Sequence, residues 1–381
     1  MLGGRFLSKS HVEKQPNRFI LTLKWLWQTQ VGITIISVIL SLLVLMVLVL
    51  IYGAKPGVVL SALFEGALRG KQAVVATLEE MAVLILTGLA VLIPIKGGYF
   101  NIGGQGQLEC GALVAVIIAT TLPGPPILII PLALICAMIT GVFVGSIPLA
   151  LHVKRGSSEV TSALMLNFVC TNFLCAMFYG PLKDPTAFYG ATRPVPEAYR
   201  LPEIGGFHIG VIFAFVLAIL VYILLNRTVY GTQVYATGYN KRAALTAGIS
   251  TGKILNSSVL LGAAIAGLAG GMEVMGVTNR VAQSWAMNWG FTGVCVAFLG
   301  GNAIGVIPIA FLLSIIATGG RFMQAMTGVP EALVSIMQGL PVVIFLLLTA
   351  LKSNSIPLSR SDIFGRKKRA NSETDEEVKA A

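Results

Sequence analysis

The side chains best suited to chemistry in this sequence are scattered, and none forms a recognisable catalytic set. The histidines, His11, His152 and His208, lie far apart and show no metal-ligand spacing. The cysteines lie in or beside apolar stretches, where they act as small hydrophobic residues. A glycine-rich segment before Lys253 is too short for a phosphate loop, and Ile254 stands where a hydroxyl should hold magnesium. We therefore expect no catalytic residue, no metal ligand and no nucleotide site on this chain.

A first polar segment, residues 96–111, interrupts apolar sequence. It joins two apolar stretches through glycines and enters the second with Gln105, Gln107 and Glu109. Irregular backbone at membrane depth is tolerated only against protein or a water-filled cavity. A carboxylate in the middle of a lipid-facing helix costs about 2.5–3.5 kcal/mol on insertion scales. We therefore interpret these three residues and Asn101 as candidates to line a polar pathway. The alternative is a turn at the membrane surface, with Glu109 reaching toward water.

Other polar residues lie singly in apolar stretches. Asn167 and Asn172 share one stretch, and they are candidates for hydrogen bonds to a substrate or to a neighbouring helix. The wider set has the same two interpretations, structural bonding and substrate contact, and both stay open. Its other members are Glu79, Glu80, Glu159, Glu273 and Gln338.

A third segment, the polar loop of residues 226–254, predicts a short helix. Asn240 can cap the beginning of a helix over residues 241–247, and Gly248 can end it. A small, alanine-rich helix of this kind suits docking into a groove of a partner protein. The alternative is a plain linker between two apolar stretches, which would need neither capping device.

These segments belong to a chain whose composition requires an apolar environment. Of its 381 residues, 55% are hydrophobic and only 11% are charged, and the mean hydropathy is +0.83. Soluble domains carry about a quarter charged residues. The net charge of +11 does not indicate nucleic acid, because the basic residues gather between apolar stretches. Since these stretches lack the alternation of barrel strands, the sequence predicts an all-α, polytopic integral membrane protein.

About ten apolar stretches are candidates for transmembrane helices, which need about 20 residues each. They cover residues 31–52, 74–95, 105–121, 127–151, 160–179, 209–225, 255–276, 288–299, 303–316 and 333–351. The third, eighth and ninth are short and rich in glycine, so we expect eight to ten helices.

The distribution of Lys and Arg predicts the orientation of these helices. It places both chain termini and the loop 226–254 in the cytoplasm, and residues 180–208 outside. The predicted organisation is a cytoplasmic segment (residues 1–30), a transmembrane domain (31–351) and a cytoplasmic tail (352–381). The acidic, polar end of that tail is expected to be disordered.

The polar segments together resemble the permease subunits of bacterial ATP-binding cassette importers for branched-chain amino acids, simple sugars and nucleosides. The family's early motif, approximately Asn-Ile-Gly-x-Glu-Gly-Gln, resembles residues 101–107, where Gln105 replaces the usual Glu. The cytoplasmic signature, roughly Ala-x-Gly-x-Asn-x-x-Ala-Ala-x-x-x-Gly-Ile, resembles residues 236–249. The matching positions are Ala236, Gly238, Asn240, Ala243, Ala244, Gly248 and Ile249. Residues 156–167, 180–185 and 290–302 resemble the nucleoside and simple-sugar branch, and the whole resemblance covers about residues 73–351.

This resemblance implies a transport subunit of the bacterial cytoplasmic (inner) membrane, rather than an enzyme. It implies import of a nucleoside or a simple sugar by alternating access, with the residues of the cytoplasmic signature coupling the chain to a separate ATPase. ATP and magnesium are expected on that ATPase, and no cofactor on this chain. The implied partners are the ATPase, a second permease, identical or related, and an extracytoplasmic solute-binding protein, within membrane lipid and without nucleic acid.

A secondary transporter or channel that needs no ATPase is the alternative. It predicts ionisable groups paired across the membrane interior. The sequence offers carboxylates near the ends of the apolar stretches and few Lys or Arg partners within them.

Overall fold

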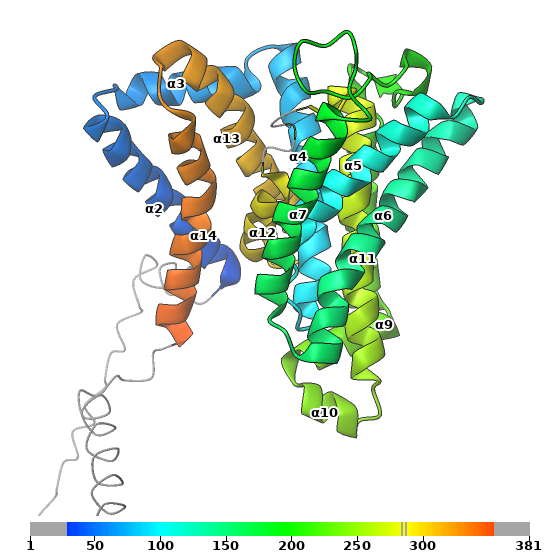
Figure 1. Ribbon diagram of the computed structural model, residues 1–381. Coiled ribbons are helices and arrows are strands. Elements are labelled where there is room, and N and C mark those ends of the chain that lie inside the picture. The colour runs from blue at the N-terminus through cyan, green and yellow to red at the C-terminus, as the bar shows by residue number, and fades with distance from the viewer. Residues whose placement is uncertain (1–28, 283–284, 286–287, 354–381) are drawn as a thin grey trace, which may run out of the picture. The chain divides into compact units, whose positions relative to one another are not determined.

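The computed structural model describes residues 29–282, 285 and 288–353, and it is built almost entirely of helices (Figure 1). The long helices are α2 (Gln30–Ile51), α4 (Lys71–Lys96), α5 (Gly104–Thr121), α6 (Pro126–Arg155), α7 (Glu159–Tyr179), α8 (Gly210–Arg227), α11 (Thr251–Glu273), α13 (Val306–Thr327) and α14 (Glu331–Ser353). The shorter helices are α3 (Pro56–Leu68), α9 (Val229–Tyr239), α10 (Lys241–Thr246) and α12 (Trp289–Gly300), with the single turns η1 (Glu197–Tyr199) and η2 (Val274–Thr278). The strands β1 (Glu203–Ile204) and β2 (Phe207–His208) form one small antiparallel hairpin.

Residues 40–344 form one compact unit. The remaining described residues, 29–39 and 345–353, are the first part of α2 and the last part of α14, and they belong to a second unit. Residues 1–28 and 354–381, which hold His11 and most of the two predicted cytoplasmic segments, lie outside the described residues.

The prediction of an all-α polytopic membrane protein is confirmed. Among the described residues, 8 helices are long and apolar enough to cross a membrane, which is within the predicted range. The predicted stretch 288–299 forms α12, whose 12 residues span only about 18 Å of an apolar layer about 30 Å thick. The predicted stretch 303–316 ends too early, because α13 continues to Thr327 with Arg321 inside it.

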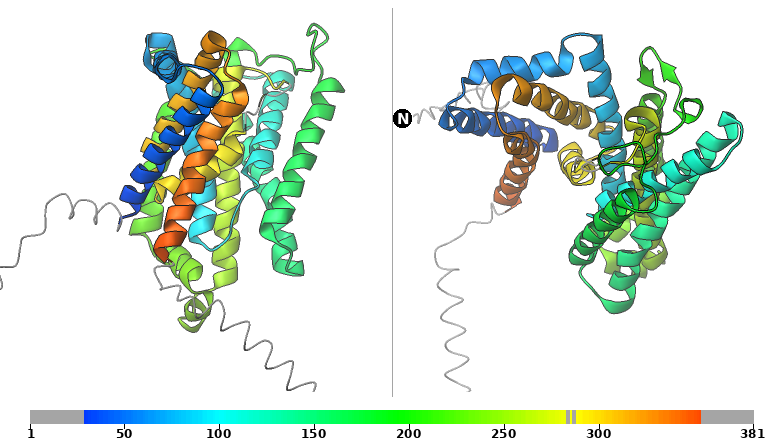
Figure 2. Two further views of the ribbon diagram at one scale, coloured as in Figure 1. Left: turned by 90° about the vertical axis from the view of Figure 1, so that its left-hand side faces the viewer. Right: turned by 45° about the horizontal axis from the view of Figure 1, so that its top comes forward.

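The helices α4 and α11 form the interior of the large unit. Most of the apolar length of each is buried, and α11 packs against α4, α5 and α6. By contrast, α6, α7 and α8 bury a third of their apolar length or less, and Figure 2 shows α6 and α7 together at one side of the unit. Exposed apolar residues such as Phe143 and Phe168 lie on these helices. This arrangement suits a bundle surrounded by lipid or by a partner's apolar helices.

Small residues bring α11 unusually close to its neighbours. Gly267 lies against Gly111 of α5 and Gly141 of α6. A Cβ atom on Gly111 would come within 2.5 Å of the carbonyl oxygen of Gly267, so no larger residue fits there. Close approach through small residues replaces the hydrophobic driving force that helices lack in lipid.

The segment 180–209 covers the end of the unit opposite α10 (Figure 1). The Thr192 N–H donates to the Val281 carbonyl at 2.8 Å, and the Leu201 N–H donates to the Met275 carbonyl at 2.9 Å. These bonds fasten the segment to residues that follow α11. The hairpin at its end buries His208, so the segment is an ordered cap.

Candidate functional site

The first polar segment begins where α4 ends. The helix stops at Lys96, and Gly98 takes a φ of +85°, a left-handed conformation that glycine adopts without strain. The chain then turns back, and α5 begins at Gly104. Within the turn the Gly103 N–H donates to Oδ1 of Asn101 at 3.1 Å. The glycines therefore allow a sharp reversal that Asn101 stabilises.

Asn101 and Gln107 bond to each other across this turn. The Asn101 amide donates to Oε1 of Gln107 at 3.3 Å, and the Gln107 amide donates to Oδ1 of Asn101 at 3.2 Å. Both side chains are buried. The two amides thereby satisfy each other, which offsets the cost of removing them from water.

Asn167 fastens α7 to the beginning of α5. Its Oδ1 accepts from the Gly106 N–H at 3.0 Å, and its amide donates to the Ile102 carbonyl at 3.0 Å. The first N–H groups of a helix have no partner within that helix. Asn167 supplies such a partner from a separate helix.

A hydrogen-bonded chain links three helices through Gln105 and Glu109. The Gly290 N–H of α12 donates to Oε1 of Gln105 at 2.8 Å, and the Gln105 amide donates to Oε1 of Glu109 at 2.9 Å. The Thr171 hydroxyl of α7 donates to Oε2 of Glu109 at 2.7 Å. The side chain at position 105 therefore has to accept one hydrogen bond and donate another, and the neutral amide of Gln105 does both.

The structure gathers five of the six predicted pathway residues around the start of α5: Asn101, Gln105, Gln107, Glu109 and Asn167. All five are buried. Asn101 bonds to Gln107 and Gln105 to Glu109, whereas Asn167 bonds to the main chain at the start of α5. Their role in a pathway remains a prediction. Asn172 is separate from them. It lies on the exposed side of α7, and its amide donates to the Phe168 carbonyl within the same helix.

The third polar segment, the loop 226–254, contains the expected short helix. Oδ1 of Asn240 accepts from the Ala243 N–H at 3.1 Å, and Gly248 takes a φ of +81°. Both predicted capping devices are therefore confirmed. The helix α10 ends at Thr246, one residue earlier than predicted, and Ile249 returns to donate its N–H to the Ala244 carbonyl. The helix α9 precedes it and holds Ala236 and Gly238.

The two alanines predicted to dock α10 have different environments. Ala244 is buried within this chain, whereas Ala243 is exposed. Two large apolar side chains near Ala243 in the sequence are also exposed, Leu245 and Tyr239, the second of them by 87%. Neither was among the residues expected to dock. The signal that could have identified them in the sequence was the presence of large apolar side chains in an otherwise polar loop.

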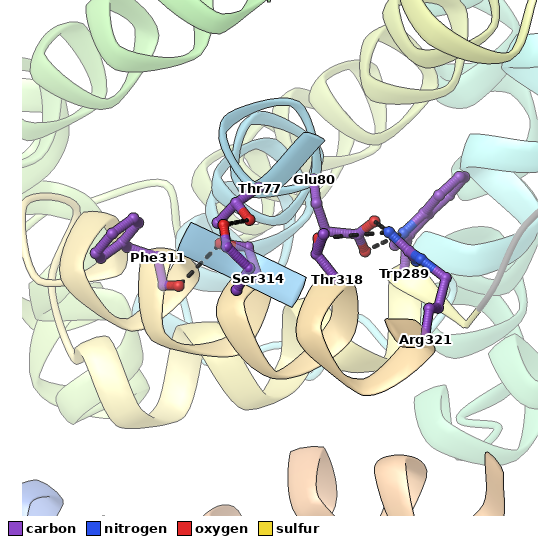
Figure 3. A network of polar contacts seen from close by, with 8 residues as sticks. Thr77, Glu80, Trp289, Phe311, Ser314, Thr318 and Arg321 are labelled. Carbon is purple, nitrogen blue, oxygen red and sulfur yellow. Dashed lines mark hydrogen bonds and ion pairs between the residues drawn. The ribbon is translucent and has the colours of Figure 1, made fainter. Parts of the chain in front are cut away.

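A further polar network joins α4, α12 and α13, and it was not predicted as a unit (Figure 3). Oε2 of Glu80 lies 3.2 Å from Nη2 of Arg321. Oε1 of Glu80 accepts from the indole N–H of Trp289 at 2.7 Å. Glu80 was a candidate, but Arg321 was overlooked because the predicted helix ended before it. The expectation of few Lys or Arg partners in the apolar stretches therefore missed one ion pair.

Metal binding has no visible candidate in the part of the chain that the structure describes. No group of three or more His, Cys, Asp and Glu side chains there could hold a metal ion.

The fold and these sites describe a polytopic α-helical membrane protein with a buried polar network and a short helix displayed at one end. The sequence profile of the family described as "branched-chain amino acid transport system / permease component" matches residues 73–346. The chain therefore belongs to this family and is a permease component rather than an enzyme, as the resemblance implied.

Three curated relatives match most of the chain. The glucose ABC transporter permease protein TsgB13 of Haloferax volcanii is 30% identical over 83% of this chain and 87% of its own length. The guanosine ABC transporter permease protein NupP of Bacillus subtilis is 33% identical over 80% of this chain and 90% of its own. The nucleoside ABC transporter permease protein NupB of Lactococcus lactis is 32% identical, over 81% and 88%. No solved structure was found to match this chain.

Proposed function

We propose that this chain is the permease subunit of an ATP-driven importer and forms part of the pathway for a nucleoside or a simple sugar. The names of the three relatives support this cargo class, because two are named for guanosine or nucleosides and one for glucose. The chain works in the bacterial cytoplasmic membrane. The loop 226–254 and both termini face the cytoplasm, and the segment 180–208 faces outside.

One contact carries the coupling part of the proposal. Gly238, at the end of α9, lies against the main chain of Lys96 and Gly98. The helix α10 is thus linked, through α9, to the turn that holds Asn101 and the start of α5. A partner that pulls α10 would move this turn, and the spans would reorient around the cargo. Alternating access that is driven by an ATPase requires a movement of this kind.

The proposal includes three partners, which the family membership of the chain supports. A separate ATPase holds ATP and magnesium and docks on α10. A second permease completes the pathway, and a solute-binding protein delivers the cargo from outside. The names of two relatives from Bacillus subtilis support a related second permease. NupP and NupQ are both named guanosine ABC transporter permease proteins, and both match this chain.

The test is reconstitution of the complex that co-purifies with this chain from native membranes. An ATPase and a second permease should be recovered with it. Vesicles loaded with ATP should then take up guanosine or glucose when the solute-binding protein is present. Uptake without ATP, driven by a proton or sodium gradient, would contradict the proposal.

The secondary-transporter alternative gains one supporting observation, the ion pair between Glu80 and Arg321. Paired ionisable groups in a membrane interior are typical of ion-coupled carriers. The gradient arm of the same vesicle experiment decides between the two functions. Under the importer proposal, collapse of both gradients leaves the ATP-driven uptake unchanged.

A further inference from the structure

A small polar pocket lies beside the Glu80–Arg321 ion pair, between α4, α13 and α14. Its volume is about 80 Å³, which is room for a few water molecules or for one edge of a small ligand. Six polar residues line it: Glu80, Asn288, Arg321, Gln324, Ser335 and Gln338. Glu80 lies nine residues into α4, about 14 Å along the helix axis. A polar pocket at this depth is costly unless it serves a water-filled path.

The centre of the pocket is a carboxylate held in one orientation. Glu80 is nearly buried, and each of its oxygens accepts one hydrogen bond, from Trp289 or from Arg321 (Figure 3). A carboxylate has about four acceptor positions, so Glu80 can accept further bonds from a ligand. The Arg321 side chain is 43% exposed and also donates to the Thr318 hydroxyl at 3.4 Å. Its guanidinium therefore faces the pocket while it braces the carboxylate.

The rim of the pocket both donates and accepts. Asn288, Gln324 and Gln338 each present an amide, and Ser335 presents a hydroxyl. None of the described residues that line the pocket is aromatic, so these residues offer a purine or pyrimidine no ring to stack on. Neighbouring hydroxyls on a sugar need both a strong acceptor and several donors. The pocket therefore has the chemistry to bind a vicinal diol.

We propose that this pocket binds the hydroxyl-bearing edge of the sugar portion of the cargo during transport. The proposal rests on the proposed function. Guanosine and glucose, the cargoes named for two relatives, both carry neighbouring hydroxyls on a sugar ring, and only guanosine has a nucleobase. One pocket that reads the sugar alone can serve both chemical classes. The small volume of the pocket fits this task, because only one edge of the ring enters it.

A purely structural brace between α4 and α13 is the competing explanation for Glu80 and Arg321. A brace does not require the polar residues on the rim, and it does not distinguish hydroxylated from deoxy cargo. The test therefore changes the rim and leaves the ion pair intact. Gln324 and Gln338 are suitable because both are at least partly exposed. Gln72, on the exposed beginning of α4, provides a matched control.

The experiment measures ATP-driven uptake by the whole complex in vesicles with one solute-binding protein throughout. The probes are guanosine against 2′,3′-dideoxyguanosine, and glucose against 2-deoxyglucose. The contribution of the binding protein cancels when variants are compared with the wild type. Each hydrogen bond to a hydroxyl changes a rate by about 2- to 10-fold. In the double variant Gln324→Leu, Gln338→Leu, the preference for the hydroxylated probe should fall at least about 5-fold, through slower uptake of that probe.

The control Gln72→Leu should keep the wild-type preference. If the double variant is inactive toward every probe, Ser335→Ala is scored in the same way, with an expected fall of at least about 2-fold. An unchanged preference in the scored rim variant, with uptake intact, overturns the sugar pocket and leaves the importer proposal standing. A wild-type complex that takes up neither cargo with ATP overturns the importer proposal, and the sugar pocket with it.

Discussion

Gly98 at the end of α4 lies directly against Gly238 at the end of α9, and a Cβ atom on Gly98 would come 3.2 Å from the Cα atom of Gly238. The contact connects two segments that the sequence presents separately. One leads to Asn101 and the start of α5, and the other leads to Asn240 and α10. Because only main-chain atoms meet, no flexible side chain lies between the two segments to absorb a movement of one against the other.

Gly238→Ala should therefore uncouple ATP hydrolysis from uptake. A Cβ atom at this position would meet the Lys96 carbonyl, so α9 must shift away from α4. Since α10 itself is unchanged, the ATPase should still co-purify, while uptake falls at least about 10-fold. ATPase recovery and vesicle uptake, measured on the same preparation, check this. Gly252→Ala is the matched control because nothing lies within 4 Å of a Cβ atom there, and loss of uptake in that variant as well would contradict the specific role of Gly238.

Gln105→Glu should harm the structure, although it introduces the glutamate of the family motif that residues 101–107 resemble. The Gln105 amide donates to Glu109 at 2.9 Å, and a second carboxylate there would leave Glu109 without this donor and facing a like charge. A buried charged acceptor that loses its donor costs more than about 1–3 kcal/mol, and the like charge adds to this cost. We expect a lower melting temperature in detergent and reduced uptake.

Restoring the lost donor should rescue that variant. The double change Gln105→Glu with Glu109→Gln puts one amide and one carboxylate back in reversed order, and Thr171 and Gly290 can still donate to the remaining oxygens. Recovery of at least half of the lost melting temperature is the expected result. A double variant no more stable than Gln105→Glu alone would mean that this hydrogen bond does not limit stability.

The parts of the fold that depend on local sequence could be predicted. Apolar length predicted most of the spans, although the predicted stretches 105–121 and 288–299 are not among the 8 helices long and apolar enough to cross a membrane. The pair Asn240 and Gly248 predicted α10, because caps act within one turn of a helix. Contacts between distant elements could not be predicted in this way. The bonds from Gly290 to Gln105 and from Asn167 to Gly106 join residues far apart in the chain. Arg321 was missed for a related reason, since its cost in an apolar helix is offset by Glu80 on another helix.

The orientation of the chain makes a direct prediction. The segment 180–208, which contains the fully exposed Phe188, and the helix α10, which Asn240 caps, lie at opposite ends of the large unit (Figure 1). In intact cells, Phe188→Cys should react with an impermeant thiol reagent, and Asn240→Cys should react only after the cells are opened. The positive-inside distribution of Lys and Arg gives this orientation. The reverse pattern of labelling would invert the topology and place α10 beyond the reach of a cytoplasmic ATPase.

His208 predicts that stability declines in acid. Its side chain is buried, both ring nitrogens lack a hydrogen-bond partner in the described structure, and burial lowers the pKa of His208 from 6.5 to about 4. The Glu79 carboxylate accepts from the main chain of His208. Glu203 is the residue paired with His208 in the hairpin. Between pH 6.5 and about 4 the unfolded chain binds a proton at His208 that the folded chain excludes. The free energy of unfolding should therefore fall as pH falls through this window, by up to about 3 kcal/mol.

Melting temperatures at pH 7 and pH 5 measure this effect. His208→Phe keeps an aromatic ring between Gly210 and Gly276, which lie against the histidine, and removes the titration. The difference between the two pH values should shrink in that variant. A difference as large in His208→Phe as in the wild type would mean that His208 is not the group responsible.

The last prediction separates the two alanines of α10. Ala243 is exposed and Ala244 is buried within the chain, so substitution by glutamate should have a different effect at each position. Ala243→Glu should insert normally and keep the wild-type melting temperature of the isolated permease. In the complex, its carboxylate would be buried without a partner on the docking surface, which is strongly unfavourable. We expect loss of ATPase co-purification and at least about a 10-fold fall in ATP-driven uptake.

Ala244→Glu should instead disturb the loop itself, because a carboxylate is costly to bury at this position and the loop has to rearrange to expose it to water. Its expected signs are a lower melting temperature and easier proteolysis of the loop, even before any partner binds. Tyr239→Ala provides a milder test of the docking surface, since this 87% exposed side chain can be removed without burying a charge. It should weaken ATPase recovery and leave the melting temperature unchanged. Full ATPase recovery and full uptake in both Ala243→Glu and Tyr239→Ala would show that the ATPase docks elsewhere.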